Sequence, residues 1–462
     1  MKALSVVILA AGAGTRMKSA LPKVLHPLSG KPMLAYLLAA AISLKPQQIV
    51  VVIGRKGEEI KKFLQDKGSN ISWVVQEKQL GTADALRKAE NKLKNFSGDV
   101  LILCGDTPLL QTATLKNFVG FHRRGKSVLT VLTVNKEAPF GYGRILHSED
   151  GRVIGIVEEK DADSLQRRIK EVNSGVFCLD NLSLWPVLKK IKADNLKKEY
   201  YLTDAVGLLA GQGRPVKSFL AGDEQELLGI NSRKELAIAE SVIQRRITEN
   251  LMRSGVTIIK PETVYIELGV SVGRDTVILP GSILIGSTKI GSGCRIGPYS
   301  YIEDSILGKQ VEVRASFLYK AEISDQVKVG PYSHLREKSV LKRNVRVGNF
   351  TEVKKSVIGS GTKVSHLSYI GDAALGKKIN VGAGVITCNY DGRNKHHTDI
   401  GDGVFVGSNV NLVAPLKIGR QAVIGAGSTI TDDIPAYGLA LARSLQIVKK
   451  NWVKKRRKKT DA

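Results

Sequence analysis

The chain of 462 residues has few cysteines, few aromatic residues and no long apolar run. Its four cysteines, Cys104, Cys178, Cys294 and Cys388, lie tens of residues apart and include no Cys-x-x-Cys pair. This spacing argues against a disulfide framework or a zinc site and favours reduced thiols in a cytoplasmic protein. The longest apolar run, at 33–44, has 12 residues and is too short to span a bilayer. We therefore expect a cytoplasmic protein without a membrane span.

Acidic residues are scarce beside basic ones, with 43 Asp and Glu against 70 Lys and Arg and a net charge of +27. The basic residues are spread along the whole chain, and the one dense block is the tail at 449–450 and 454–459. No helix-turn-helix, zinc-finger or base-stacking signature accompanies them. We therefore expect no specific nucleic-acid partner and a basic surface that attracts polyanionic small substrates, with a solvated tail.

Two sequence patterns meet near residue 255. Before it, short runs of Val, Ile and Leu alternate with segments of helical periodicity, which indicates an α/β domain around a mostly parallel sheet. The expected strands are 5–9, 49–53, 71–75, 100–104 and 128–134, and the expected helices are 32–44, 58–65, 82–93 and 115–123.

One more helix is predicted at the junction. Ser232 and Glu235 fit the Ser-x-x-Glu capping box, and Gly255 follows the end of the helix. Five apolar residues share one face of it: Leu236, Ala239, Ile243, Ile247 and Leu251. The expected organisation is therefore an N-terminal domain at 1–233, a linker helix at 234–254 and a C-terminal domain at 255–462.

After Gly255 the period changes to six. Aliphatic residues recur at six-residue steps from Ile266 to Ile302, from Ile323 to Val353, and in shorter runs that end at Ile430. A hexad places one inward aliphatic residue on each short strand with a tight turn between strands, which is typical of a parallel β-helix. The spacing does not determine the hand of the helix. Hexapeptide β-helices as a family are left-handed, and we expect that hand from the resemblance.

A glycine-rich segment follows the first expected strand. It runs Leu-Ala-Ala-Gly-Ala-Gly-Thr-Arg-Met from Leu9, with Pro22-Lys23 shortly after. Gly12 and Gly14 allow a phosphate to approach the backbone closely. A dinucleotide-binding fingerprint needs glycine where Met17 stands, and a Walker loop needs Gly-Lys-Ser/Thr, so the segment fits neither.

The pattern Leu-x2-Gly-x-Gly-Thr-x-Met with Pro-Lys resembles the sugar-1-phosphate nucleotidyltransferases, whose fold is Rossmann-like. The match continues in order through Gln76, Gly81-Thr82, Gly105-Asp106, Gly141-Tyr142-Gly143-Arg144, Glu158, Asn173-Ser174-Gly175 and Gly229-Ile230-Asn231. Together with the hexads, the whole chain is similar to the bacterial bifunctional N-acetylglucosamine-1-phosphate uridyltransferases/glucosamine-1-phosphate N-acetyltransferases. Such enzymes make UDP-N-acetylglucosamine for peptidoglycan and lipopolysaccharide precursors.

The resemblance gives the N-terminal residues roles. A sugar-1-phosphate oxygen attacks the α-phosphorus of UTP while pyrophosphate leaves, so catalysis rests on positioning and electrostatic clamping. Arg16 and Lys23 are the catalytic cations expected on the triphosphate, and Asp106 and Asn231 are the expected Mg²⁺ ligands. The expected contacts to UTP or the UDP-sugar are Leu9, Ala10, Ala11, Gly12, Lys23, Gln76, Gly81, Thr82, Gly143, Glu158, Asn173 and Asn231.

Polar residues interrupt the hexads and argue for chemistry in the C-terminal domain. Acetyl transfer from a thioester to an amine needs a base, and histidine suits that role. Of the seven histidines, His366 occupies the position that matches the base of the family. The resemblance assigns the phosphate of glucosamine 1-phosphate to Arg336, Lys354, Tyr369 and Asn380, and acetyl-CoA to Ala383, Asn389, Tyr390, Ser408, Ala426 and Arg443. The basic tail could join Arg443 on the CoA phosphates or serve solubility alone.

The resemblance also implies a homotrimer with active sites between subunits. Two other hypotheses remain open: a single-activity nucleotidyltransferase whose hexads serve assembly alone, and a non-enzymatic nucleic-acid-binding protein. The hypothesis of hexads that serve assembly alone does not explain the presence of His366, Lys354 and Arg336 among the coils. The phosphate loop with Asp106 and Asn231 argues against the second.

Overall fold

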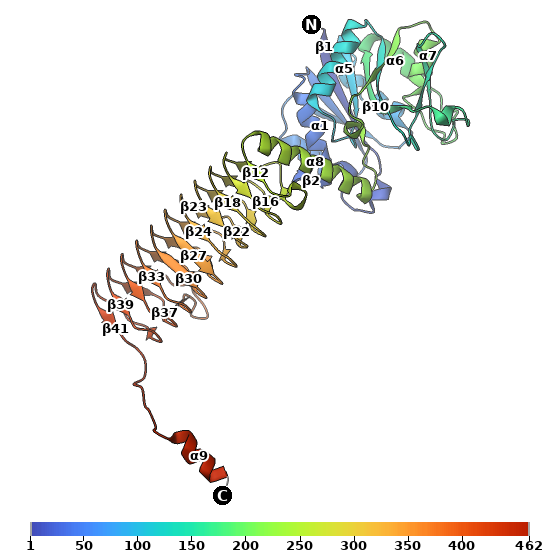
Figure 1. Cartoon of the computed structure of the whole chain (residues 1–462). Coiled ribbons are helices and arrows are strands. Elements are labelled where there is room, and N and C mark those ends of the chain that lie inside the picture. Colours follow the sequence, from blue (N-terminus) through green and yellow to red (C-terminus); the bar gives the residue numbers. More distant parts are fainter. Residues whose placement is uncertain (1, 461–462) are drawn as a thin grey trace. The chain divides into compact units, whose positions relative to one another are not determined.

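The computed structural model describes residues 2–460 and, among them, the side chains up to 457. The chain divides into two compact units, Met1–Ile243 and Gln244–Ala462 (Figure 1). The boundary lies inside helix α8 (Arg233–Arg253). None of the helices at 2–460 is long and apolar enough to cross a membrane. The structure leaves all four cysteines as free thiols.

The first unit contains a mixed, mostly parallel sheet in the order β11-β7-β10-β6-β1-β4-β5. Strand β10 is antiparallel to both of its neighbours, and the other pairs along this path are parallel. Each predicted strand is present. The bounds are β1 (Ala3–Ala10), β4 (Gln48–Gly54), β5 (Ile71–Gln76), β6 (Gly98–Cys104), β7 (Leu129–Asn135), β10 (Glu171–Asp180) and β11 (Val216–Leu220). Beside this path, β8 (Arg144–His147) pairs with β10, and β9 (Val153–Val157) pairs with β8.

Burial on both faces explains the continuous apolar strands. In β1, Val6 and Ile8 belong to one core and Val7 to the other. Helices α1 (Met33–Ile42), α2 (Glu58–Gln65) and α5 (Thr112–Arg124) contribute to the first core. Helices α3 (Thr82–Arg87), α4 (Glu90–Leu93), α6 (Asn181–Lys190) and α7 (Asp204–Ala210) contribute to the second. The result is a three-layer α/β unit.

The segment predicted as one helix at 82–93 is two helices, α3 and α4. At the break, the N–H groups of Lys88 and Ala89 bond to the carbonyls of Ala85 and Leu86, three residues back instead of four. This tighter turn interrupts the α-helical hydrogen bonding, and apolar periodicity alone does not reveal it.

The second unit forms the left-handed parallel β-helix of six-residue repeats that the sequence predicts. Its strands build three parallel sheets of 11, 10 and 9 strands, and up to β40 every third strand falls in the same sheet. The first sheet runs from β12 (Thr257–Ile258) to β41 (Leu439–Ala440), the second from β13 (Tyr265–Ile266) to β40 (Thr429–Ile430), and the third from β14 (Ser271–Val272) to β38 (Leu416–Ile418).

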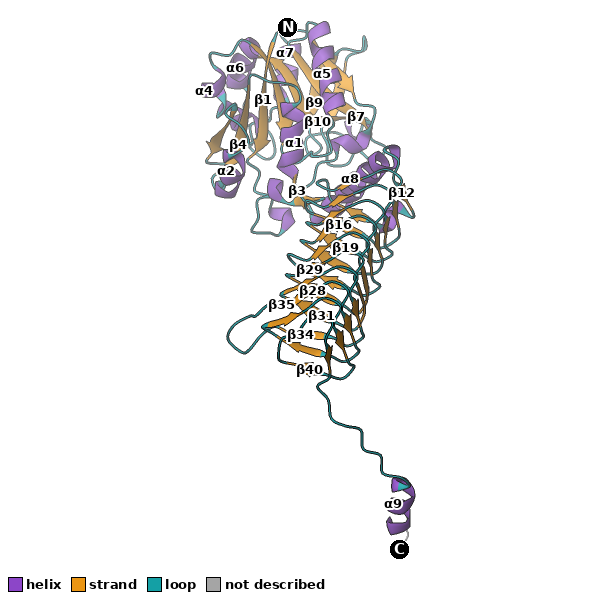
Figure 2. Cartoon of the chain, turned by 90° about the vertical axis from the view of Figure 1, so that its left-hand side faces the viewer, coloured by secondary structure: helices purple, strands orange, loops and turns teal. Residues whose placement is uncertain are grey.

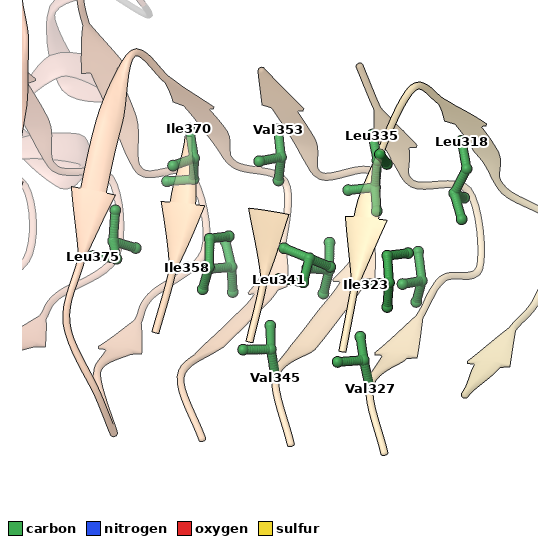
Figure 3. Close-up of a cluster of buried hydrophobic side chains, with 14 of the residues drawn as sticks. Leu318, Ile323, Val327, Leu335, Leu341, Val345, Val353, Ile358, Ile370 and Leu375 are labelled. Carbon is green, nitrogen blue, oxygen red and sulfur yellow. The ribbon is translucent and has the colours of Figure 1, made fainter. Parts of the chain in front are cut away.

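Aliphatic residues of the hexads stack on one another inside the coils. Leu318, Leu335, Val353 and Ile370 pair in register through four successive strands (Figure 3). Among the residues predicted to point inward, Val272 is only partly buried. It lies on the first strand of its sheet, so no further coil covers its outer side.

Helix α8 begins with the predicted capping box. Glu235 Oε2 accepts from Ser232 N at 2.7 Å, and Ser232 Oγ accepts from Glu235 N at 3.4 Å. Within the second unit, the Gln244 side chain bonds to both backbone groups of Ile266. Ile247 and Leu251 pack on the β-helix core. These contacts cover the open end of the first coils.

Candidate functional site

A cleft of about 650 Å³ in the first unit lies at the carboxyl ends of β1, β4 and β5. Ligands of open α/β sheets bind at this edge, next to the point where the strand order reverses. Here the chain runs from β1 outward to β4 and β5, then returns to place β6 on the other side of β1. The predicted residues that line this cleft are Ala10, Ala11, Gly12, Lys23 and Gln76.

Lys23 connects the phosphate loop to the two predicted metal ligands. Its Nζ donates to Asp106 Oδ2 at 2.7 Å and to Asn231 Oδ1 at 3.1 Å. Asp106 follows the end of β6, and its carbonyl accepts from Ile230 N at 2.8 Å, which holds Asn231 beside it. Two oxygens from distant segments therefore converge on one cation.

Gly14 makes room for this arrangement. Its backbone has φ of +61°, and a Cβ added there would lie 2.8 Å from Lys23 Cβ. Gly12 differs, because a Cβ added to it would meet no atom within 4 Å. Gly12 thus faces open space in the cleft, where a ligand could approach its backbone.

The Asp106 and Asn231 oxygens suit Mg²⁺. This ion takes hard oxygen ligands and usually binds through one or two protein groups, with phosphate oxygens and water completing the shell. The contact of both oxygens with the Lys23 ammonium shows that the pair accommodates a cation. Among residues 2–460, no group of three His, Cys, Asp or Glu forms a metal site by itself.

Gln76 holds the segment around Gly81 and Thr82. Its side-chain amide donates to Gly81 O at 3.1 Å and to Asp84 Oδ2 at 2.8 Å. Gly81 has φ of +111°, and a Cβ there would lie 2.5 Å from Tyr200 O. Thr82 Oγ1 accepts from Leu202 N. These contacts fix the loop that the resemblance assigns to the uracil ring.

The predicted sugar contacts Gly143, Glu158 and Asn173 lie near one another. A Cβ added to Gly143 would lie 3.5 Å from Glu158 Cδ, and Asn173 N donates to Gly143 O at 2.8 Å. Glu158 also lines a second cavity of about 680 Å³ with Asp204. Burial raises the pKa of Glu158, and burial with the Glu158 charge raises the pKa of Asp204 to about 6.

Arg16 is exposed and does not line the cleft. The lining residues that were not predicted include Arg55 and Lys56 in the loop after β4, and Gln79, whose side chain donates to Ala11 O at 2.8 Å. Arg55 and Lys56 add two cations to the cleft.

In the second unit, His366 lies at the end of β30 (Lys363–His366) and pairs with Asn349 on β27 (Arg346–Asn349). His366 Nδ1 lies 2.8 Å from Asn349 Oδ1. An amide oxygen can only accept, so Nδ1 is the donor in this contact, and a neutral ring in this orientation has its lone pair on Nε2. His366 is exposed, so its Nε2 is open to a ligand. Asn349 was not among the predicted residues.

Small residues follow His366 in the same position of successive coils. Val364, Val381, Val406 and Ile424 pair in register, and His366, Ala383, Ser408 and Ala426 each lie two residues after one of them. Arg443 Nη1 donates to Ala426 O at 3.0 Å. Three of the predicted acetyl-CoA residues, Ala383, Ser408 and Ala426, thus form a row that begins at the histidine.

The predicted phosphate-binding cations cluster on the neighbouring sheet. Arg336 Nη1 donates to Glu352 Oε1 at 2.9 Å, and Lys354 Nζ lies 4.0 Å from Glu337 Oε1. The Lys395 ammonium beside Lys354 lowers the pKa of Lys354, as does Arg336. Lys395, which was not predicted, therefore belongs to this group of cations.

Lys395 comes from a loop at 389–397 that leaves the coil between β34 (Ile386–Cys388) and β35 (Thr398–Ile400), as Figure 2 shows. The loop includes the predicted Asn389, which is buried and bonds to Asp372, and Tyr390, which is exposed. Tyr369 begins β31 (Tyr369–Gly371), and Asn380 begins β33 (Asn380–Val381), which belongs to another sheet.

One chain does not bring all of these groups together. His366 and Asn380 belong to the sheet that contains β30 and β33, whereas Lys354 and Tyr369 belong to the sheet of β28 (Glu352–Lys354) and β31. Among residues 2–460, neither a hydrogen bond nor an ion pair joins His366 to Arg336, Lys354 or Asn380. A single coil stack therefore presents a base and a cation cluster as separate groups.

Comparison with known proteins supports both halves. Residues 5–224 match the family model described as nucleotidyl transferase, and residues 269–304 and 397–432 match that described as bacterial transferase hexapeptide (six repeats). The chain is 47% identical over 455 residues to the bifunctional protein GlmU of Trichlorobacter lovleyi, covering 98% of each. It is 49% identical over 459 residues to that of Caldanaerobacter subterraneus subsp. tengcongensis, covering 99% of each. The chain therefore belongs to the family of bifunctional GlmU proteins.

Proposed function

We propose that this protein makes UDP-N-acetylglucosamine in two steps in the cytoplasm. The β-helix acetylates glucosamine 1-phosphate with acetyl-CoA. The α/β unit then transfers UMP from UTP to N-acetylglucosamine 1-phosphate and releases pyrophosphate. The observation that carries the proposal is the presence of two separate sites on one chain: Lys23 with Asp106 in the first unit, and His366 with Asn349 in the second.

In uridyl transfer, a sugar-phosphate oxygen forms a bond to the α-phosphorus of UTP as the bond to pyrophosphate breaks. The open backbone at Gly12 can lie against the nucleotide, and Lys23, Arg55 and Lys56 supply positive charge to the cleft. Asp106 and Asn231 would hold Mg²⁺, which neutralises phosphate charge when bound. Arg16 is exposed beside the phosphate loop and could turn toward the triphosphate.

In acetyl transfer, the amine nitrogen forms a bond to the thioester carbonyl and the carbon–sulfur bond breaks. His366 Nε2 takes the proton that the amine loses, and CoA leaves as a thiolate that is then protonated. Asn349 keeps the other ring nitrogen protonated. Arg336, Lys354 and Lys395 suit the sugar phosphate, and the row of Ala383, Ser408 and Ala426 leaves space for the pantetheine arm.

The active assembly that we propose is a homotrimer. The base and the cation cluster of one chain lie apart, so a complete site needs groups from neighbouring subunits. An exposed apolar row borders His366 and supports such contacts: Tyr299, Tyr332, Phe350 and Leu367, at 71%, 62%, 56% and 61% exposure. Light scattering at micromolar concentration should give a trimer. A monomer that retains acetyl transfer would contradict the shared site.

Two variants test the pair of activities. His366→Ala should abolish CoA release from acetyl-CoA and glucosamine 1-phosphate but spare UDP-sugar formation from N-acetylglucosamine 1-phosphate. Asp106→Ala should have the opposite effect. Wild-type protein that forms the UDP-sugar but releases no CoA would reject the bifunctional proposal in favour of a single-activity nucleotidyltransferase.

A further inference from the structure

Arg144 carries a charge in the interior of the first unit. It begins β8, is 2% exposed, and is the largest fully buried side chain in the described part of the chain. A buried guanidinium is costly unless it is paired and hydrogen-bonded. Arg144 lines neither the cleft at the phosphate loop nor the cavity beside Glu158. The proposed uridyl transfer leaves this residue without a role.

The Arg144 guanidinium joins three segments of the first unit. Its Nη2 donates to Glu159 Oε2 at 2.6 Å, and that oxygen also accepts from Gly141 N at 3.2 Å. Nη1 donates to Tyr142 O, and Nη2 reaches Arg167 O at 3.4 Å. One planar group therefore fixes the loop before β8, the segment after β9 and a short helix further along the chain. The fork of N–H donors on arginine suits this role, and lysine has no equivalent.

Two predicted sugar contacts are direct neighbours of these residues. Gly143 lies between Tyr142 and Arg144, and Glu158 precedes Glu159. A Cβ added to Gly143 would lie 3.5 Å from Glu158 Cδ, so the two predicted contacts lie close together. The ion pair therefore fixes the backbone beside both of them.

We infer that Arg144 and Glu159 form a positioning pair, which sets the separation of Gly143 and Glu158 and thereby the affinity for the sugar phosphate. The inference rests on the proposed function, in which Gly143 and Glu158 contact that sugar. UTP binding should not depend on the pair, because the phosphate loop and Gln76 come from other segments. A pair that served stability alone would change the amount of folded protein without separating the two substrates.

Two variants of the full chain test the pair. Arg144→Gln leaves Glu159 without its ionic partner. Arg144→Met with Glu159→Met leaves no unpaired charge in the interior, and such exchanges of a whole buried pair often preserve folding. In both variants, KM for N-acetylglucosamine 1-phosphate should rise at least about tenfold, because the two sugar contacts are displaced. Kd for UTP with Mg²⁺, measured by calorimetry, should match that of the wild type.

Arg123→Gln is the matched control. Arg123 Nε donates to the buried Asp99 Oδ2 at 2.9 Å, and its Nη2 donates to Lys2 O at 2.6 Å. Asp99 and Lys2 lie at the amino ends of β6 and β1, away from the cleft at the carboxyl ends. The control should lower the unfolding temperature and change neither KM for the sugar phosphate nor Kd for UTP. CoA release should stay at the wild-type rate in every variant.

Three results would overturn the inference. The first is that the pair variants fold with the wild-type KM for the sugar phosphate, or do not fold at all, which would leave the pair a purely structural role. The second is an equal rise in that KM and in Kd for UTP, which would show a general disturbance of the first unit. The third is the same rise in KM in Arg123→Gln. Wild-type protein that forms no UDP-sugar would instead reject the proposed function and, with it, the inference.

Discussion

Lys23 Nζ lies 2.7 Å from Asp106 Oδ2, a contact between residues 83 positions apart that joins the phosphate loop to the end of β6. Both side chains are partly exposed, at 12% and 25%. The pair therefore remains accessible to a ligand in the cleft. In the proposed reaction, the Lys23 ammonium would stabilise the negative charge that develops on the leaving pyrophosphate.

Replacing Lys23 with Gln should slow uridyl transfer without affecting acetyl transfer. The change removes the positive charge and keeps a polar side chain of similar length. We expect kcat to fall by about 10²- to 10³-fold, the usual cost of losing one group that stabilises transition-state charge. Steady-state pyrophosphate release measures the first activity, and CoA release is the internal control. Unchanged pyrophosphate release would remove Lys23 from the mechanism.

The two loop glycines should respond differently to alanine. Gly14→Ala forces a side chain into left-handed backbone and against Lys23, so the free energy of unfolding should fall by about 1–2 kcal/mol or more, together with uridyl transfer. Gly12→Ala meets no neighbour, so stability should be kept while KM for UTP rises. Chemical denaturation and initial rates distinguish the two. Equal stability losses in both variants would contradict this difference.

Asn349→Asp should change the pH dependence of acetyl transfer. A carboxylate beside the His366 ring stabilises the charged imidazole, which cannot act as a base. The acidic limb of the pH–rate profile should therefore move to higher pH, whereas Asn349→Ala should lower kcat without that displacement. Uridyl transfer should keep its profile in both variants. Identical profiles for the Asp and Ala variants would show that the residue does not act through His366.

Asp204 should make the first unit less stable as pH rises. Burial raises its pKa from 3.8 to about 6. Below pH 3.8 both the folded and the unfolded carboxyl are protonated. Between 3.8 and 6 only the unfolded form ionises, and above 6 the folded state carries the whole cost of the buried charge. Asp204→Asn should therefore raise the unfolding temperature more at pH 8 than at pH 5.

Calorimetry at both pH values measures that difference. The exposed Glu149→Gln, in the same unit, is the control and should change neither transition. A larger stabilisation at pH 5 than at pH 8 would reverse the sign of the argument and reject the raised pKa.

The sequence predicted those parts of the fold in which aliphatic side chains are buried at regular intervals along the chain. The six-residue period follows from one inward aliphatic residue per strand, and the structure buries Ile278, Leu335 and Ile424 accordingly. The continuous apolar strands likewise follow from cores on both faces of the sheet. The break between α3 and α4 was not predictable, because a change from four-residue to three-residue hydrogen bonds leaves the apolar pattern unchanged.

Contacts between distant segments were harder to predict from the sequence. Arg55 and Lys56 line the cleft from a loop without periodicity, so the sequence carried no signal for them. Asn349 did carry one: it stands 17 residues before His366, about the length of one coil, so it occupies the same corner. Arg16 matched a motif, but its side chain is exposed and does not line the cleft.

The central claim is that two independent sites on one chain act in sequence, and mixing two variants tests it most directly. Acetyl-CoA, glucosamine 1-phosphate and UTP are supplied to His366→Ala, to Asp106→Ala, and to an equal mixture of both. We predict that neither variant alone forms UDP-N-acetylglucosamine and that the mixture does, because one variant supplies the acetylated intermediate and the other consumes it. UDP-N-acetylglucosamine formed by either variant alone, or a mixture that stays inactive although each variant retains its expected half-reaction, would contradict the account.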